Sequence, residues 1–430
     1  MSLPTAVPAS GPTPPEDTTP SVYRLPFPPG FTERGGCPFD PPPMLRDHHD
    51  QGEVREVALT DGSTGWLVTG YEEGRTLLSD PRLSSDRLRN PLVVKLPAQL
   101  RAQLMADEAV AGNFIAMDPP DHTRYRRMLT RQFTLRRVRQ LEPRILEIVT
   151  ERIDAMLARG TGADLVRDFS LAVPSLVICE LLGVAYEERG EFQARTEELL
   201  NLDIPFEKQL AALDELRKFI LGQVRRKRAT PTDDMLSDLI RSDTEPPLTD
   251  EEVVGMANLL LVGGHETTAN MLSLGTFALL EHPEQFEALR DRPELMDGAV
   301  EELLRYLSIV HHGLLRTTTE DVEIAGRTIP AESLVIISVS EANRDPRHYD
   351  TPAALDVSRP RRTHLAFGHG IHQCIGQQLA RSEMTIAFPE LLRRLPGLRL
   401  AVPADQVPLR EKMAVYGLHS LPVTWDAPDA

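Results

Sequence analysis

Residues 365–383 read LAFGHGIHQCIGQQLARSE and carry the most specific motif of the chain. It contains the pattern Phe-x-x-Gly-x-x-x-Cys-x-Gly, formed by Phe367, Gly370, Cys374 and Gly376. The two glycines would let backbone approach a flat ligand closely. Cys374 stands where a glycine-rich loop runs into a predicted helix, and N–H groups aimed at a sulfur there would stabilise a thiolate. The pattern therefore predicts that Cys374 is a metal-binding thiolate.

Two other interpretations of Cys374 are weaker. A structural cysteine in a turn would not need the three other residues of the pattern. A zinc site made with His369 and His372 lacks a fourth ligand and the usual spacing. The remaining cysteines, Cys37 and Cys179, lie far away in the sequence, so the three form no disulfide framework and favour a reducing cytoplasm.

The segment resembles the haem-binding loop of the cytochrome P-450 family, particularly its soluble bacterial members of the actinobacterial type. The likeness extends over roughly residues 25–426. It implies the mainly α haem-thiolate fold with a minor β subdomain, and haem b with Cys374 as the axial iron ligand and Phe367 among its contacts. A thiolate ligand pushes electron density onto iron and favours O–O cleavage. The resemblance thus implies a monooxygenase that inserts one oxygen atom from O2 into its substrate.

The second motif is ANLLLVGGHETTANMLSLGTFALL, residues 257–280. A capping box at Thr249–Glu252 predicts the start of a long helix that spans the whole segment. Glycine costs roughly 1 kcal/mol against alanine in a helix. Gly263 and Gly264 at the centre of an apolar helix therefore indicate close passage of a ligand.

In the P-450 family, a Gly-x-acid-Thr stretch lies over the haem on the oxygen-binding side. By that resemblance Gly264 contacts the haem, Thr267 hydrogen-bonds the iron-bound dioxygen, and Glu266 relays protons to it from solvent. A threonine hydroxyl can also bond to the carbonyl four residues earlier, here Gly263, and open the helix locally. A zinc-protease helix is excluded, because its second histidine would fall on Ala269.

Four basic residues are candidates for contacts to the haem propionates. DPPDHTRYRRML, residues 118–129, places His122 and Arg126 four apart on one helical face. Arg316 opens a strand region, and His372 lies two residues before the cysteine. Burying two propionates requires paired donors, and the resemblance assigns these four residues to them.

Other charged residues are expected to act outside the haem pocket. Glu302 and Arg305, three apart on one helix face, would alone be an ordinary surface pair. In the family, the matching Glu-x-x-Arg joins a later arginine to brace the cysteine loop, and Arg359 occupies that place. By the same resemblance, electrons come from a ferredoxin served by an NAD(P)H-dependent reductase. Arg127 and Arg381, near the thiolate side, are candidates to meet an acidic ferredoxin.

The substrate is expected to be a bulky, largely apolar small molecule, such as a polyketide, macrolide, terpenoid or xenobiotic. The overall character resembles actinobacterial enzymes of specialised metabolism or xenobiotic oxidation. The resemblance places the substrate contacts in apolar segments. They are residues 87–115, 200–210, the helix before Gly263, 309–314 and the tip near Tyr416.

The whole chain has 430 residues, of which 41% are hydrophobic and 26% charged, an ordinary globular composition. Lys and Arg number 47 against 64 Asp and Glu, a net charge of −17 that argues against nucleic-acid binding. No apolar run of membrane-spanning length and no signal peptide is visible, which favours a cytoplasmic protein. Residues 1–24 are rich in proline and predict a disordered tail. Residues 25–430 predict one domain, expected to be a monomer.

Strands are predicted near both ends of the chain. Residues 54–59 and 64–69 flank an Asp-Gly turn, and strand patterns return at 322–329, 333–340 and 396–426. From about residue 97 the pattern is helical for some 200 residues. Amphipathic helices are predicted at 136–158, 187–201, 208–228 and 249–281. Strands from the two ends could pair into one β subdomain beside the helices.

Overall fold

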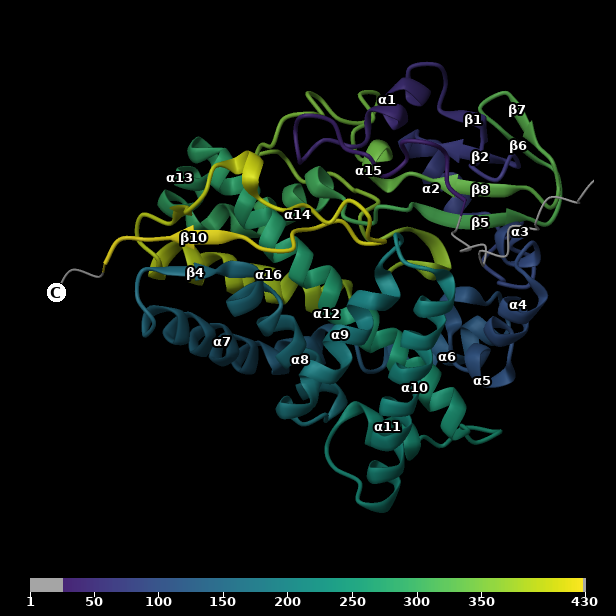
Figure 1. Cartoon of the computed structure of the whole chain (residues 1–430), viewed down its shortest axis with the longest axis horizontal. Coiled ribbons are helices and arrows are strands. Elements are labelled where there is room, and N and C mark those ends of the chain that lie inside the picture. The colour runs from purple at the N-terminus through teal and green to yellow at the C-terminus, as the bar shows by residue number, and fades with distance from the viewer. Residues whose placement is uncertain (1–25, 428–430) are drawn as a thin grey trace, which may run out of the picture.

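The computed structural model describes residues 26–427. The predicted tail, residues 1–24, lies outside the described residues, and its division from one domain over 25–430 stays a prediction. Within residues 26–427, no helix combines the length and apolar character needed to span a membrane. Helices make up most of the described chain, and a smaller β part lies at one side (Figure 1).

Helix α12, Asp250–Glu281, runs through the middle of the helical body (Figure 1). The predicted capping box is present: the Thr249 hydroxyl accepts from the Glu252 N–H, and the Glu252 carboxylate accepts from the Thr249 N–H. A helix that is apolar on all faces must be buried on all faces. Its neighbours are α8 (Ala172–Leu182), α10 (Phe206–Ala229), α14 (Met296–Leu307) and α16 (Gln377–Arg394).

The four predicted amphipathic helices are confirmed, with ends within two residues of the prediction. They are α7 (Leu135–Leu157), α9 (Arg189–Leu200), α10 and α12. In α7, the buried residues Ile145, Val149 and Ile153 recur every four positions, so one stripe of the helix packs against α8 and α16. Helical periodicity was therefore a sufficient signal for the long helices.

The predicted β subdomain is also confirmed. Strands β1 and β2 form an antiparallel hairpin, and β2 pairs in parallel with β8 from the other end of the chain. The sheet order is β1-β2-β8-β5-β3. The bounds are β1 Val54–Ala58, β2 Thr64–Val68, β3 Leu83–Ser84, β5 Leu314–Thr318 and β8 Leu334–Ile337. All four residues of β8 are buried, which explains its continuous apolar run.

Two late segments differ from their predicted form. Residues 322–329 form a hairpin, β6 (Val322–Ile324) and β7 (Arg327–Ile329), because Ala325 and Gly326 both adopt positive φ. The strand predicted over 333–340 ends at Ile337. Ser338 then caps the short helix α15 (Val339–Ala342), its hydroxyl accepting from the Glu341 N–H. A serine after an apolar run is a strand residue or a helix cap, and the local pattern does not distinguish the two.

The remaining elements are shorter. A second small sheet joins β4 (Gly162–Asp164), β9 (Arg399–Leu400) and β10 (Pro422–Thr424), at the opposite side of the molecule from the five-stranded sheet (Figure 1). Two early helices, α1 and α2, were not predicted. The short helices are α1 (Pro43–His49), α2 (Tyr71–Ser79), α3 (Pro91–Val94), α4 (Ala98–Leu104), α5 (Asp107–Val110), α6 (Asp121–Thr130), α11 (Met235–Ile240) and α13 (Pro283–Asp291).

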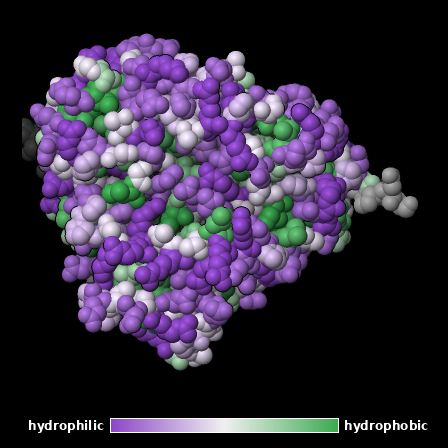
Figure 2. Space-filling model, turned by 180° about the vertical axis from the view of Figure 1, so that it is seen from behind, coloured by the Kyte–Doolittle hydropathy of each residue, from purple (hydrophilic) through white to green (hydrophobic). Residues whose placement is uncertain are grey.

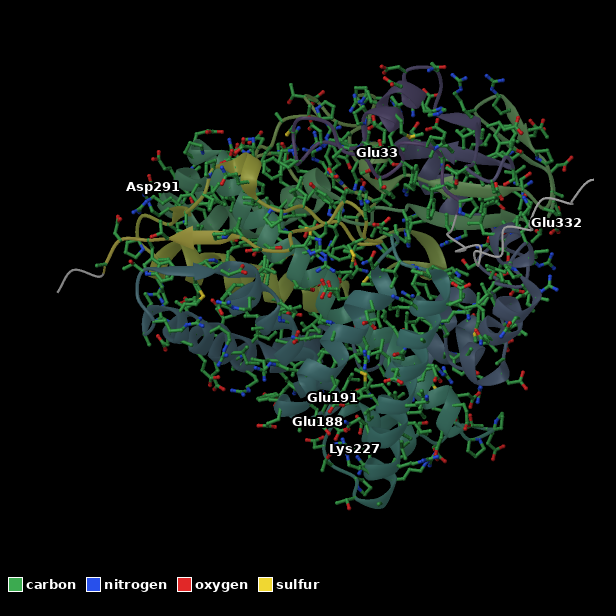
Figure 3. All side chains as sticks on the ribbon, in the orientation of Figure 1. Glu33, Glu188, Glu191, Lys227, Asp291 and Glu332 are labelled. Atoms are coloured by element: carbon green, nitrogen blue, oxygen red, sulfur yellow. The ribbon has the colours of Figure 1, made fainter. Side chains whose placement is uncertain are left out.

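A large cluster of buried apolar side chains lies between α7, α12, α14 and α16. Gly275 of α12 allows the closest approach there, because a Cβ would lie 2.7 Å from the Phe388 ring. The outer surface is mainly hydrophilic, with apolar residues scattered over the face in Figure 2. Charged side chains such as Asp291 and Glu332 stand at opposite ends of the molecule (Figure 3).

Candidate active site

The cysteine loop, residues 365–376, leads into α16 and presses on the end of α2. Gly370 adopts a φ of +73°, and a Cβ there would lie 2.3 Å from the Leu78 carbonyl oxygen. The Cys374 N–H donates to the Phe367 carbonyl at 2.8 Å and closes the loop. Gly370 is therefore required for the contact between loop and helix, which its place in the motif did not reveal.

Cys374 differs from Cys179 in its surroundings. Its side chain is exposed, whereas Cys179 is fully buried and has a pKa raised to about 12 by desolvation. Desolvation also raises the pKa of the Cys374 thiol, while a hydrogen bond from the Gly376 N–H and the charges of Arg126 and Arg381 act to lower it. The Gly376 contact agrees with the predicted N–H stabilisation of a thiolate.

The predicted brace of the loop region is confirmed. Arg305 donates to both Glu302 oxygens at 2.8 and 2.7 Å, and Arg359 Nε donates to Glu302 Oε1 at 3.0 Å. The side chains of Glu302 and Arg305 are almost fully buried. Arg305 also donates to the carbonyls of Asn343, Pro352 and Ala354. These three charged residues are occupied by structural hydrogen bonds.

Arg381 belongs to a second ionic cluster beside the cysteine loop. Its guanidinium donates to both oxygens of Glu301, at 2.6 and 3.0 Å, and lies 4.5 Å from the centroid of the Phe367 ring. His364 contacts the same carboxylate at 3.1 Å. Burial alone would raise the pKa of Glu301, but the hydrogen bonds from His364 and Arg381 hold it at about 2. Arg381 therefore positions Phe367 from within the protein, whereas Arg127 is exposed.

The four predicted propionate contacts lie together. The rings of His122 and His372 are 4.3 Å apart between centroids, and Arg126 and Arg316 are close enough to disfavour protonation of His372. Desolvation, followed by these charges, lowers the pKa of His372 to about 3, and desolvation lowers that of Arg316 to about 10. Within residues 26–427, neither arginine forms an ion pair with a carboxylate.

Several ring nitrogens in this cluster lack a hydrogen-bond partner, which favours the binding of an anion. Both ring nitrogens of His122 and Nε2 of His372 are buried and meet no hydrogen-bond partner among the described residues. Asp118 is the carboxylate that favours the charge of Arg316, but its oxygens already accept from Ser84 and Ser85. Two arginines without a carboxylate partner, beside imidazole nitrogens without a hydrogen-bond partner, are costly to bury, so the cluster fits the two propionates of a haem.

At the centre of α12, Gly263 and Thr267 lie on a less buried side of the helix. The Thr267 hydroxyl donates to the Gly263 carbonyl at 2.7 Å, as predicted. Gly263 is exposed although most of the helix around it is buried, and a Cβ there would meet nothing within 4 Å. Gly264 instead faces α8, where its Cβ would lie 3.0 Å from Ile178. The open side of the helix is therefore at Gly263, one residue before the predicted contact.

Glu266 lies on a different side of α12 from Thr267. Its carboxylate is buried and forms an ion pair with Arg410, whose Nη1 lies 3.1 Å from Glu266 Oε2. Asn270 Nδ2 is 3.4 Å from the same oxygen. The arginine therefore contacts Glu266 on the side from which protons were expected to arrive from solvent. Nothing in the sequence around Arg410 pointed to this contact, because a single arginine in a polar turn has no periodic or motif signal.

The segments predicted to contact a substrate converge. The Ala414 N–H donates to the Leu200 carbonyl at 2.8 Å, and Val310 forms an isolated bridge with Val415. The 87–115 segment reaches the start of α10 through an apolar cluster that includes Leu96, Leu100 and Phe206. Segments far apart in the sequence therefore meet beside α12 and present mainly apolar side chains.

The donor set fits a haem better than a bare metal ion. Among the described residues, no group of three or more His, Cys, Asp or Glu side chains is arranged to hold a metal. Cys374 offers one sulfur ligand, and the cluster of two arginines and two histidines offers hydrogen-bond partners for two carboxylates. A flat group that brings its own nitrogen ligands would complete such a site.

Comparison with known proteins identifies the same family as the sequence motifs. The cytochrome P450 family model matches residues 106–423. The chain is 47% identical to cytochrome P450-SU2 of Streptomyces griseolus, over 91% of this chain and 95% of the relative. It is 46% identical to pentalenic acid synthase of Streptomyces avermitilis, over 93% and 98% of the two chains. The crystal structure of CYP105P1 in complex with filipin I superposes with a TM-score of 0.86, at 42% identity over 92% and 98% of the chains. The chain therefore belongs to the cytochrome P450 family, and it is an oxidoreductase of the monooxygenase type.

Proposed function

We propose that this P450 binds haem b through Cys374 and oxidises a bulky, largely apolar small molecule. The observation that carries the proposal is the pairing of an accessible thiol with a cluster of two arginines and two histidines in which neither arginine has a carboxylate partner among the described residues. His122, Arg126, Arg316 and His372 would hold the propionates, and Phe367 would lie beside the macrocycle. Haem b, when bound, supplies the activation of O2.

The residues of α12 would manage protons and exclude water. Thr267 Oγ1 donates to the Gly263 carbonyl, so its lone pairs can accept a hydrogen bond from a molecule held beside Gly263. Glu266 would exchange a proton at Oε2, where Arg410 and Asn270 contact it. Gly264 packs on α8 and would act by setting the helix position; Gly263 would be the residue passed closely by the haem.

The substrate class rests on the converging apolar segments and on the relatives. One relative is named a pentalenic acid synthase, and another was crystallised with filipin I. We place the substrate of this chain among polyketides, macrolides, terpenoids and similar xenobiotics. The apolar cluster around Leu96, Leu100 and Phe206 supports a bulky ligand.

The electron donor would be a ferredoxin with an NAD(P)H-dependent reductase. Arg127, exposed on α6, supports docking of an acidic protein, whereas Arg381 is held by Glu301 and would serve the cysteine loop instead. Three free cysteines support a reducing cytoplasm as the place of action. We propose that the enzyme works as a monomer.

The test is turnover with a surrogate ferredoxin and reductase, using apolar natural products chosen by the spectral shift that each causes on binding. Products are identified by mass spectrometry, and product formed per NAD(P)H consumed is measured. Thr267→Ala should keep binding and NAD(P)H consumption but release much of the flux as hydrogen peroxide. Thr268→Ala, on a buried face of α12, is the matched control and should stay coupled. Unchanged coupling in Thr267→Ala would remove the role assigned to this hydroxyl.

A further inference from the structure

Arg410 reaches the centre of α12 from the C-terminal segment. Leu409 and Leu418 form a bridge, and the Arg410 N–H donates to the Gly417 carbonyl at 2.8 Å, so residues 409–418 make a narrow turn. This turn is tied to the end of α9, because the Leu202 N–H donates to the Lys412 carbonyl. In Figure 1 the yellow C-terminal segment passes beside the upper end of α9.

The turn presses tightly on α12. A Cβ on Gly417 would lie 1.6 Å from Asn270 Oδ1, so only glycine allows this contact. Asn270 in turn donates to the Glu266 carbonyl at 2.8 Å. The position of the turn is therefore fixed relative to Glu266, and Arg410 has little freedom to leave the ion pair while the turn is in place.

The ion pair is buried and incompletely satisfied. The side chains of Arg410 and Glu266 are 7% and 3% exposed. Arg410 Nη1 contacts Glu266, but Nε and Nη2 are buried and meet no acceptor among the described residues. Buried guanidinium donors are normally all paired. These two atoms therefore point to an acceptor from outside the chain, and water is the smallest that satisfies them.

His419 connects Arg410 with the surface. Partial burial, and then the charge of Arg410, lower the pKa of His419, while Glu197 and Glu266 act to raise it. Its side chain is 48% exposed, and Nδ1 lies 3.9 Å from Glu197 Oε1 on α9. Glu197 and His419 lie at the surface where α9 meets the C-terminal turn, and we call this place the seam. Polar side chains thus lead from the seam to Glu266 in the order Glu197, His419, Arg410.

We infer that Arg410 is a positioning residue that holds Glu266 as a carboxylate and binds, through Nε and Nη2, the water by which Glu266 exchanges protons with the seam at His419. The inference rests on the proposed function of Glu266. It assigns a direction to the proton supply: protons enter from the α9 side and pass Arg410. Glu266 then hands them toward Thr267.

The first measurement reads the charge of Glu266 directly. Infrared spectra of the haem-loaded protein at neutral pH are recorded for Arg410→Met, Arg410→Lys and the control Lys412→Met, an exposed cation on the same turn. A buried carboxylate that loses its counter-ion takes up a proton. Arg410→Met should therefore gain a protonated-carboxyl band, which disappears when Glu266→Gln is added. Arg410→Lys and Lys412→Met should show no such band.

The second measurement reads proton delivery. Arg410→Met should lose at least about 10²-fold in product formation, the lower end of the roughly 10²–10⁴-fold range of a lost acid–base group, and its solvent deuterium isotope effect should rise. The substrate-induced spectral shift should keep its midpoint, and Arg410→Lys should recover most of the turnover. If Arg410→Met does not retain haem, Arg410→Gln replaces it in both measurements.

Three results would overturn the inference. They are the absence of a Glu266 band in Arg410→Met, full product formation despite the band, and a loss confined to substrate affinity. The last would mean that Nε and Nη2 bind the substrate rather than water. A parent enzyme without oxygen insertion would instead refute the proposed function, and the infrared result would still decide whether Arg410 sets the charge of Glu266.

Discussion

At the scale of single residues, surroundings separate one cysteine from the others. Cys179 is enclosed by apolar side chains of α8 and its neighbours, and desolvation disfavours its thiolate. Cys374 has a backbone N–H and two arginines to stabilise negative charge on sulfur, and its side chain is accessible. Of these two cysteines, only Cys374 is accessible and has neighbours that favour a thiolate, which supports it as the proposed iron ligand.

Cys374→Ala should therefore abolish the strongly red-shifted Soret band that thiolate-bound haem gives after reduction and exposure to carbon monoxide. Only a charged sulfur ligand produces that band. Cys179→Ala and Cys37→Ala are the matched controls, and both should keep it. A Cys374→Ala protein that still shows the band would mean that another residue binds the iron.

Several donors of the site could be predicted from the sequence, while their orientation could not. The cysteine motif predicted Cys374, and the resemblance to the P-450 family predicted the propionate contacts His122, Arg126, Arg316 and His372. Each of these residues lies in or beside a recognisable sequence pattern. Which face of α12 is open depends on the helices packed around it. The structure shows Gly263 on that face and Glu266 turned toward Arg410. A contact between residues 144 positions apart leaves no local trace in the sequence.

At the scale of elements too, features with a local sequence pattern could be predicted, and features set by packing could not. Long helices and the paired strands follow from hydrophobic periodicity, and they were predicted almost to their ends. The short helices α1 and α2 were not, because nine residues or fewer hold too few turns for a periodic signal. The strand predicted through Ser338 ends early because that serine caps α15. Whether such a serine continues a strand or caps a helix depends on tertiary packing.

The brace between α14 and the segment before the cysteine loop gives an element-scale prediction. Glu302 accepts from Arg305, from Arg359 and from the Asp356 N–H at 3.0 Å. Glu302→Gln leaves two guanidinium groups without a counter-ion, one of them fully buried. Breaking a buried charge pair typically costs about 3–5 kcal/mol. Denaturant unfolding should show a loss of that order, together with faster haem release on dilution.

The control for the brace is Glu332→Gln, the same substitution in an exposed pair. Glu332 and Arg89 are 63% and 47% exposed and lie 3.5 Å apart, so their pairing contributes at most about 1 kcal/mol. The labelled Glu332 side chain stands at the edge of the molecule in Figure 3. Equal losses in the two variants would show that burial of the brace does not matter to stability.

At the scale of the whole molecule, charge is distributed unevenly between surface and interior. The net charge of −17 comes from 64 acidic against 47 basic residues, and few of the described carboxylates are buried. Glu341 on α15 is an exception, with no exposed surface. Arg46 Nε lies 2.8 Å from Oε1, but neither oxygen of Glu341 accepts a hydrogen bond of good geometry within the described residues. Desolvation raises the pKa of Glu341 to about 7, against the opposing charges of Arg46 and Arg344.

This raised pKa predicts how stability depends on pH. In the unfolded chain Glu341 has the ordinary glutamate pKa of 4.5, and in the folded protein its pKa is about 7. Between these values the folded state binds more protons than the unfolded state, so this group lowers stability as pH rises. Its contribution is neutral below about 4.5 and reaches its full destabilising size above about 7, on the order of 3 kcal/mol.

Glu341→Gln imitates the protonated carboxyl at every pH and removes this dependence. The difference in unfolding free energy between Glu341→Gln and the parent should therefore grow in favour of the variant from pH 5 to pH 8. Subtracting the parent cancels the titration of all other groups that the substitution leaves unchanged. The same difference for Glu332→Gln should stay flat, because that carboxylate is exposed. A flat or falling difference for Glu341→Gln would show that its ion pair with Arg46 outweighs burial and keeps the carboxylate charged.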